Sequence, residues 1–252
     1  MTSHCSWSPA PSLVWEEDAK HDWTKTITVV VGGTALESPS QIGHNRANAI
    51  VKSYVVHETI IRAESPFFEA ALSKEWKESQ ERVVKLPEQY PEAFDIYVRW
   101  IYSGKLLISR IDLTEISDFV ILTSNLSRAY ILGDVLQDTD FKDAIIDSYF
   151  DIKKSAKWIP TSGVKFIFDN TSKKSSLRRM LVDWVVTNLN LAQLCDERHA
   201  TYTTVEFYQS VMLRVKDKEN GNFDGVDEEV ESGDNHEQGL QSSGAKTVDV
   251  ID

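Results

Sequence analysis

The sequence predicts an α+β fold, and three observations lead to this class. The segment "TITVVVGG", residues 26–33, is rich in β-branched residues and ends in a glycine pair, which is typical of a buried strand followed by a turn. The segments "VKSYVVH" (51–57) and "RVVKLP" (82–87) have the composition of two further strands. From residue 91 onward helical periodicity dominates, without the regular strand–helix alternation of parallel α/β proteins.

Local signals divide the helical segments. In "ETIIRAESPFFEAALS", Pro66 suits the start of a helix and Ser65 suits its cap, so this stretch predicts two short helices. Pro91 suits the first turn of the next helix, and Gly104 suits its C-terminal stop. Residues 112–137 predict one long amphipathic helix, or two helices broken near Ser124–Asn125.

Further helices follow along the chain. The segment "DTDFKDAIIDSYFDI" opens with an aspartate that suits a helix cap. After Pro160, "GVKFIFDNT" and "SSLRRMLVDWVV" again have helical spacing, and the stretch up to residue 215 predicts one or two more helices.

Composition limits the classes of function. The formal net charge is −12, and the residues from Lys216 onward hold eleven acidic and three basic side chains, so we expect no nucleic-acid partner. No apolar run approaches the roughly 20 residues of a membrane span, and the first residues lack a secretory pattern, so we expect no membrane association. Two distant cysteines predict no disulfide framework, which agrees with a cytoplasmic or nuclear protein.

A search for catalytic or metal-binding patterns predicts no enzyme, no cofactor and no metal. No glycine-rich phosphate loop or nucleophile elbow is present. Cys195 and His199 would supply only two of the three or four ligands that zinc requires. We interpret His57 as a buried, hydrogen-bonded ring at a strand–helix corner rather than as a catalytic base. A small hydrolase or transferase with an unrecognised site remains as a separate hypothesis.

Read together, the segments resemble a BTB/POZ domain. The strand ending in glycine, the strand leading to histidine, "ESPFFEAALSKEWKESQERVVKL" and "PEAFDIYVRWIYSGKL" follow the family's order of motifs. The matching positions are His57, Ala63, Ser65, Pro66, Phe68, Glu78, Ser79, Leu86, Glu92, Ala93, Phe94, Ile101, Tyr102 and Gly104. Many spaced elements agree, so the resemblance is specific although no single motif is rare.

This resemblance implies a domain organisation. We expect a flexible N-terminal segment (1–24), a BTB/POZ domain (25–152), a helical extension (153–215) similar to that of fungal BTB proteins, and a disordered acidic tail (216–252). The N-terminal segment contains Trp7, Trp15 and Trp23, which either rest on the domain or form a linear motif for a partner.

The family also implies a function. Its members are protein–protein interaction modules; many form homodimers, and many are substrate adaptors that dock on a cullin-RING ubiquitin ligase. Others are transcription-linked scaffolds that recruit corepressors through a charged pocket, with an aspartate at the head of the first strand and a basic residue after the histidine. Here those positions are Thr26 and Glu58, so the acid is absent and the base is replaced by an acid, which disfavours that alternative.

The cullin branch of the family has a more local signal. Its members carry a hydrophobic-x-Glu motif between the second short helix and the third strand, and Trp76, Lys77 and Glu78 occupy that place. Tryptophan is a frequent anchor at the centre of an interface. Because an aromatic-x-Glu-Ser segment is also common in the family at large, the motif serves the fold in part. We therefore predict these three residues as partner-binding residues, with Trp76 as the anchor.

Overall fold

The fold was analysed in a computed structural model, which describes residues 22–33, 50–73, 77–106, 115–155, 159–188 and 203–222. The strands are β1 (Thr26–Val31), β2 (Lys52–His57) and β3 (Val83–Leu86). The helices are α1 (Glu58–Glu64), α2 (Pro66–Ser73), α3 (Lys77–Glu81), α4 (Pro91–Ser103), α5 (Ile116–Leu136), α6 (Thr139–Ser155), the 3-10 turn η1 (Thr161–Gly163), α7 (Val164–Asn170), α8 (Ser176–Asn188) and α11 (Val205–Glu219). The α+β class predicted from the sequence is confirmed.

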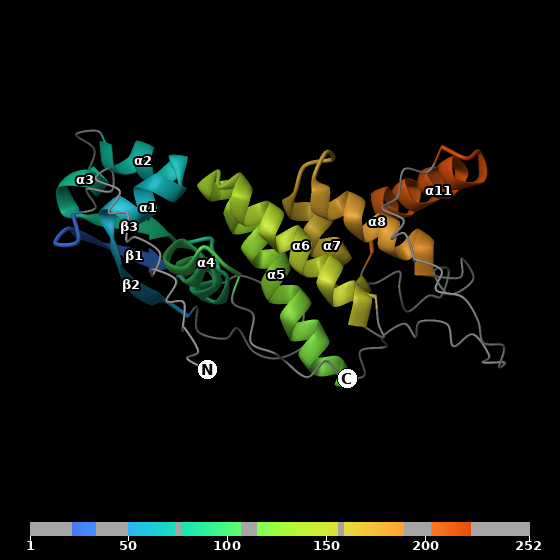
Figure 1. The fold of residues 1–252 in the computed structure, drawn as a ribbon, viewed down its shortest axis with the longest axis horizontal. Coiled ribbons are helices and arrows are strands. Elements are labelled where there is room, and N and C mark those ends of the chain that lie inside the picture. Colours follow the sequence, from blue (N-terminus) through green and yellow to red (C-terminus); the bar gives the residue numbers. More distant parts are fainter. Residues whose placement is uncertain are drawn as a thin grey trace, which may run out of the picture.

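The elements follow one another along an elongated molecule (Figure 1). The three-stranded sheet and α1–α3 lie at one end, α4–α6 form the middle, and α7, α8 and α11 lie at the other end. The strand order is β2-β1-β3, with β1 antiparallel to β2 and parallel to β3. The two outer strands therefore form opposite edges of the sheet.

Capping interactions are present at three of the helix boundaries predicted from the sequence. The Ser65 hydroxyl accepts a hydrogen bond from the Phe68 N–H (3.3 Å) and donates one to the Leu136 carbonyl (2.7 Å), so one side chain begins α2 and ties it to the end of α5. Asp138 caps α6 in the same way, since its Oδ1 accepts from the Phe141 N–H at 2.8 Å. Gly104 ends α4 in the left-handed conformation, with φ of 62°.

The long helix α5 is continuous, which decides between the two alternatives left by the sequence. The polar side chains near its middle bond within the helix pair instead of breaking it: the Thr123 hydroxyl donates to the Phe119 carbonyl (2.8 Å), and the Tyr149 hydroxyl of α6 donates to the Thr123 carbonyl (2.8 Å). By length and composition α5 could cross a membrane, contrary to the expectation that no segment approaches this length. More than half of its most apolar window is buried inside the fold, however, as in the core helices of soluble proteins.

Charged side chains join the last helices. Arg178 of α8 is 7% exposed. Its guanidinium donates to the Thr171 hydroxyl (2.9 Å) and to the Phe168 and Thr171 carbonyls, and it forms an ion pair with Glu206 of α11 (3.1 Å). It therefore caps the C-terminal end of α7 and connects that end to α11. Asp183 and Arg214 form a second α8–α11 pair at 2.6 Å.

A single buried cluster extends from the sheet to α11, so no break in the core separates the predicted domains. The boundary predicted at residue 152 falls within α6, and α11 continues past the boundary predicted at 216 to Glu219. Buried Phe207 and Val211 fix α11 against this core.

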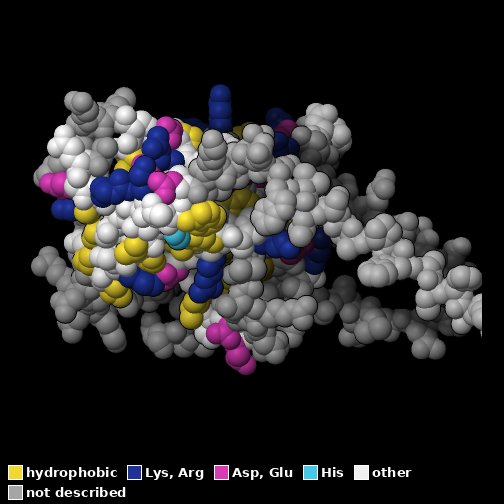
Figure 2. Space-filling model, turned by 60° about the vertical axis from the view of Figure 1, so that its left-hand side comes forward, with side chains coloured by type: hydrophobic (Ala, Val, Ile, Leu, Met, Phe, Trp, Pro, Cys, Tyr) yellow, Lys and Arg dark blue, Asp and Glu magenta, His cyan; other side chains and the backbone are white. Residues whose placement is uncertain are grey.

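The sheet end of the molecule carries exposed apolar side chains. Figure 2 shows apolar side chains gathered around a histidine on this face, and His57 is the only histidine among the described residues. The exposed apolar side chains nearby in the fold belong to Trp23, Ile50, Val51, Val55 and Tyr102.

Candidate functional site: a pocket beside a charged corner

A pocket of about 430 Å³ lies between α2, α3 and β3. Its apolar lining comes from Phe67, Ala70 and Ala71 of α2 and from Val83 and Val84 of β3. Glu78 and Glu81 of α3 and Gln137 at the end of α5 add polar groups to its wall. Lys85 of β3 also lines the pocket, so the wall carries charges of both signs. The pocket can hold an apolar side chain, and the Glu78 and Glu81 carboxylates can accept a hydrogen bond from a donor beside it.

The helical period of α2 explains why this pocket has an aromatic wall. Phe67 and Phe68 are adjacent, so they point in directions about 100° apart around the helix. Phe68 is fully buried, whereas Phe67 is half-buried and lines the pocket. The doubled phenylalanine in "SPFFEAAL" was therefore a signal of a surface aromatic residue that the sequence analysis did not use.

The three predicted partner-binding residues have different outcomes. Glu78 is half-buried and lines the pocket. Lys77 begins α3, but its side chain lies outside the described part of the chain, and Trp76 lies outside it entirely. Cys195 and His199, which the sequence analysis rejected as a zinc site, also lie outside the described residues. Among the described residues, no group of three or more His, Cys, Asp or Glu side chains could hold a metal.

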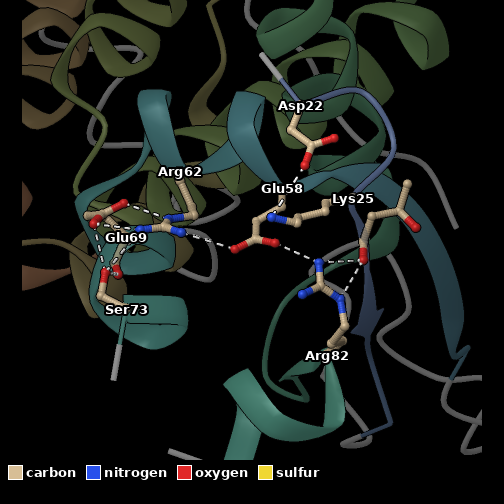
Figure 3. A network of polar contacts seen from close by, with 8 residues as sticks. Asp22, Lys25, Glu58, Arg62, Glu69, Ser73 and Arg82 are labelled. Atoms are coloured by element: carbon tan, nitrogen blue, oxygen red, sulfur yellow. Dashed lines mark hydrogen bonds and ion pairs between the residues drawn. The ribbon is translucent and has the colours of Figure 1, made fainter. Parts of the chain in front are cut away.

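A network of charged side chains fixes the corner where β2 meets α1 (Figure 3). Glu58 lies between two arginines: Arg62 binds its Oε1 at 3.0 Å and Arg82 binds its Oε2 at 2.6 Å. Arg82 also donates to the Thr26 carbonyl from two nitrogens (2.9 and 3.0 Å), and Arg62 continues the network to Glu69 at 2.7 Å. This network ties α1 and α2 to β1 and to the start of β3.

The network also explains the two positions that depart from the corepressor-type pocket. The sheet register pairs Thr26 with His57, so the head of β1 and the start of α1 are neighbours. Arg82 bridges them by binding the Thr26 carbonyl and the Glu58 carboxylate. Glu58 is 9% exposed and is already neutralised within the chain, so it is a structural residue.

The position of His57 corrects one detail of its predicted role. Its Nδ1 lies 2.7 Å from the Tyr102 hydroxyl, and its ring also makes an edge contact with Trp23, so the predicted hydrogen bond at the strand–helix corner is present. The ring is half-buried, however, rather than buried. The end of β2 lies at an edge of the described sheet, where Tyr102 of α4 and Trp23 contact the His57 ring.

Glu58 leads to a testable pH dependence. Burial alone would raise the pKa of Glu58, but hydrogen bonds and charge from Arg82 and Arg62 outweigh it, so the pKa falls below its ordinary value of 4.5. A carboxylate with a lowered pKa stabilises the fold above its unfolded-state pKa and loses this contribution as the pH falls through its folded-state pKa. We expect Glu58→Gln to lower the free energy of unfolding by about 2 kcal/mol at pH 7.

Urea unfolding of the wild type and of Glu58→Gln, measured at steps between pH 7 and pH 2.5, checks this prediction. The difference between the two proteins should be constant near neutrality and shrink as the pH falls below 4.5. A difference that stayed the same down to pH 2.5 would contradict the assignment of the ionised carboxylate as the stabilising form.

The comparison with protein families identifies the domain around this site. Residues 49–123 match the family model of the BTB/POZ domain. The chain contains a BTB/POZ domain.

The BTB/POZ match covers β2, α1–α3, β3, α4 and the first turns of α5, and therefore every residue of the pocket lining except Gln137. Strand β1 precedes the matched residues but pairs along its whole length with β2, so it belongs to the same sheet. No curated protein matches the chain. The BTB/POZ domain makes this chain a protein–protein interaction module, of a kind generally not enzymatic, and implies protein partners.

Proposed function

We propose that this BTB/POZ protein is a substrate adaptor that docks on the cullin of a cullin-RING ubiquitin ligase and associates with itself through a second surface. The observation that carries the proposal is the position of Glu78, the glutamate of the hydrophobic-x-Glu motif, in the wall of the pocket between α2, α3 and β3. An apolar partner side chain would bury its surface against Phe67 and Ala71. The carboxylate of Glu78 would orient a donor at the rim.

Trp76 is the proposed anchor because it precedes Glu78 by two residues at this joint. Replacing a tryptophan buried at the centre of an interface with alanine typically lowers the binding free energy by about 2 kcal/mol or more. The target is then held by another part of the chain: the helical extension, the N-terminal tryptophan segment or the acidic tail. Adaptor function requires only that the docking surface and the target-binding surface be separate.

A pulldown with a purified cullin N-terminal domain tests this proposal. We expect Trp76→Ala to weaken binding by about 30-fold or more, which corresponds to a loss of about 2 kcal/mol. Ala70→Arg should also weaken binding, because Ala70 is an exposed residue of α2 in the pocket lining and arginine would fill the space. Gln209→Arg, at an exposed position of α11, is the control and should bind like the wild type.

Each outcome has one meaning. If the wild type fails to bind at tens of micromolar, the cullin proposal is wrong. If binding is unchanged by Trp76→Ala, Trp76 is not the anchor. If it also resists Ala70→Arg, the cullin binds elsewhere than in the pocket. The alternative of a transcription-linked scaffold receives no support from the charged corner, since Glu58 and the Thr26 carbonyl are already bound to Arg82.

A further inference from the structure

The outer edge of β2 combines exposed backbone with exposed apolar side chains. In the described sheet β2 is an outermost strand, because β1 is its only partner strand. Val55 is 70% exposed, and Ile50 and Val51, which precede the strand, are 65% and 55% exposed. A β-branched edge strand of this kind is a template for another strand, and soluble proteins usually protect such edges with charges or bulges.

The register shows which backbone groups point outward. The His57 N–H donates to the Tyr102 hydroxyl at 3.0 Å, so at this residue the backbone points away from β1. Backbone direction alternates along a strand, so Val55 and Ser53 also direct their N–H and C=O groups outward. Val51 continues the same period just before the strand. Tyr102 thus closes the edge at His57, and no other described segment pairs with the outer edge from Val51 to Val55, which we call the open stretch.

The open stretch can pair with the same stretch of a second copy of the chain. In an antiparallel pair with a second copy, centred on Ser53, each Val51 would lie opposite Val55 of the other copy, and the two Ser53 residues would lie opposite each other. All three positions are outward-pointing in both copies, so each pair can exchange both backbone hydrogen bonds. The two valine pairs would lie on the same outer face, where β-branched cross-strand pairs stabilise a sheet.

Charge does not oppose this arrangement. Lys52 is the charged residue nearest the centre, and its ammonium group already binds the Asp95 carboxylate of α4 at 2.7 Å. Two symmetry-related lysines would therefore approach as neutralised pairs rather than as isolated like charges.

We propose that β2 is the self-association surface of this protein, joining two copies by antiparallel strand addition centred on Ser53. This inference deepens the self-association part of the proposed function and is independent of the cullin. The docking pocket lies beside β3, at the opposite edge of the sheet, so both surfaces can be occupied together.

The first test is the mass in solution, measured by light scattering after size-exclusion chromatography at tens of micromolar. The wild type should have twice the chain mass of 28.6 kDa. Val55→Lys should shift the protein to the monomer, because it places two charges in the apolar interface. Val205→Lys is the matched control: Val205 is 74% exposed on α11, so this variant should stay dimeric.

The second test determines the register in which the β2 strands of the two copies pair. In a background with Cys5→Ser and Cys195→Ser, Ser53→Cys places two thiols on directly opposed residues whose Cα atoms would be about 5.5 Å apart, within the range of a disulfide. Mild oxidation should give a covalent dimer on a non-reducing gel. Ser172→Cys, an exposed serine in the helical extension, should not.

Two results would overturn the inference. A dimeric Val55→Lys variant, or a dimer that Ser53→Cys does not cross-link, would place self-association elsewhere. A monomeric wild type would reject self-association itself, including the case in which another segment of this chain covers β2. Because the cullin pulldown uses pocket variants, it can succeed or fail separately from these tests.

Discussion

Replacing Gly32 with alanine is expected to lower the free energy of unfolding by about 3 kcal/mol or more, a large effect for a single methyl group. Gly32 has φ of 88°, a conformation that residues with a side chain rarely adopt. A Cβ atom there would lie 2.1 Å from the carbonyl oxygen of Ile50. That oxygen belongs to the backbone leading into β2, so it cannot move without disturbing the β1–β2 pairing.

Gly104→Ala separates the cost of the positive φ from the cost of the steric contact with Ile50. Gly104 also has positive φ, 62°, but a Cβ atom there would have no neighbour within 4 Å, so only the conformational cost of about 1 kcal/mol remains. Denaturant unfolding of the wild type and both variants measures the difference. Equal losses for Gly32→Ala and Gly104→Ala would show that the segment before β2 relaxes and that the contact with Ile50 is not limiting.

Arg178→Ala is expected to lower the free energy of unfolding by about 3–4 kcal/mol. The substitution leaves the Phe168 and Thr171 carbonyls at the end of α7 without the guanidinium that caps them. It also removes one of the two cations paired with Glu206, the other being Lys173, and the cation that lies 4.5 Å from the centre of the Phe168 ring. Because Arg178 is buried, water cannot replace these contacts without opening the helical extension.

Arg179→Ala is the matched control, since it removes the same side chain from the next position of α8. Its side chain is 60% exposed and lies 3.9 Å from Asp183, so we expect a loss below about 0.5 kcal/mol. Thermal unfolding followed by circular dichroism compares the two. Similar melting temperatures for both variants would show that Arg178 is not a structural tie between α7, α8 and α11.

The expected losses of stability affect tests of the adaptor proposal, because one continuous core joins the extension to the BTB/POZ domain. Buried residues connect the sheet through α5 and α6 to α8 and α11, so a loss of packing in the extension should reach the BTB/POZ domain. We therefore expect Arg178→Ala to unfold in one transition at a lower temperature than the wild type. This coupling means that binding variants should be compared only after their stability has been measured.

The sequence by itself determined the local features of this protein. Strand composition, the caps at Ser65 and Asp138, and the glycine stop at Gly104 depend on neighbouring residues, so their spacing predicts them. The BTB/POZ resemblance rests on the same kind of information, because it compares the order of such segments. It also placed Glu78 at the joint between α2 and β3, where the structure finds it in the wall of a pocket.

The tertiary structure alone decided what depends on residues distant in sequence. The sequence left open a helix break near Ser124–Asn125, whereas in the structure Tyr149 of α6 donates a hydrogen bond to the neighbouring Thr123 carbonyl and α5 is continuous. The sequence carried no signal that Arg178 is buried; α7 and α11 enclose it in the structure. The strand order β2-β1-β3, and hence the opposite edges that carry the pocket and the open stretch of β2, follows from pairings that no local pattern specifies. The physical reason is that periodicity tells which face of an element is apolar, whereas packing decides what that face contacts.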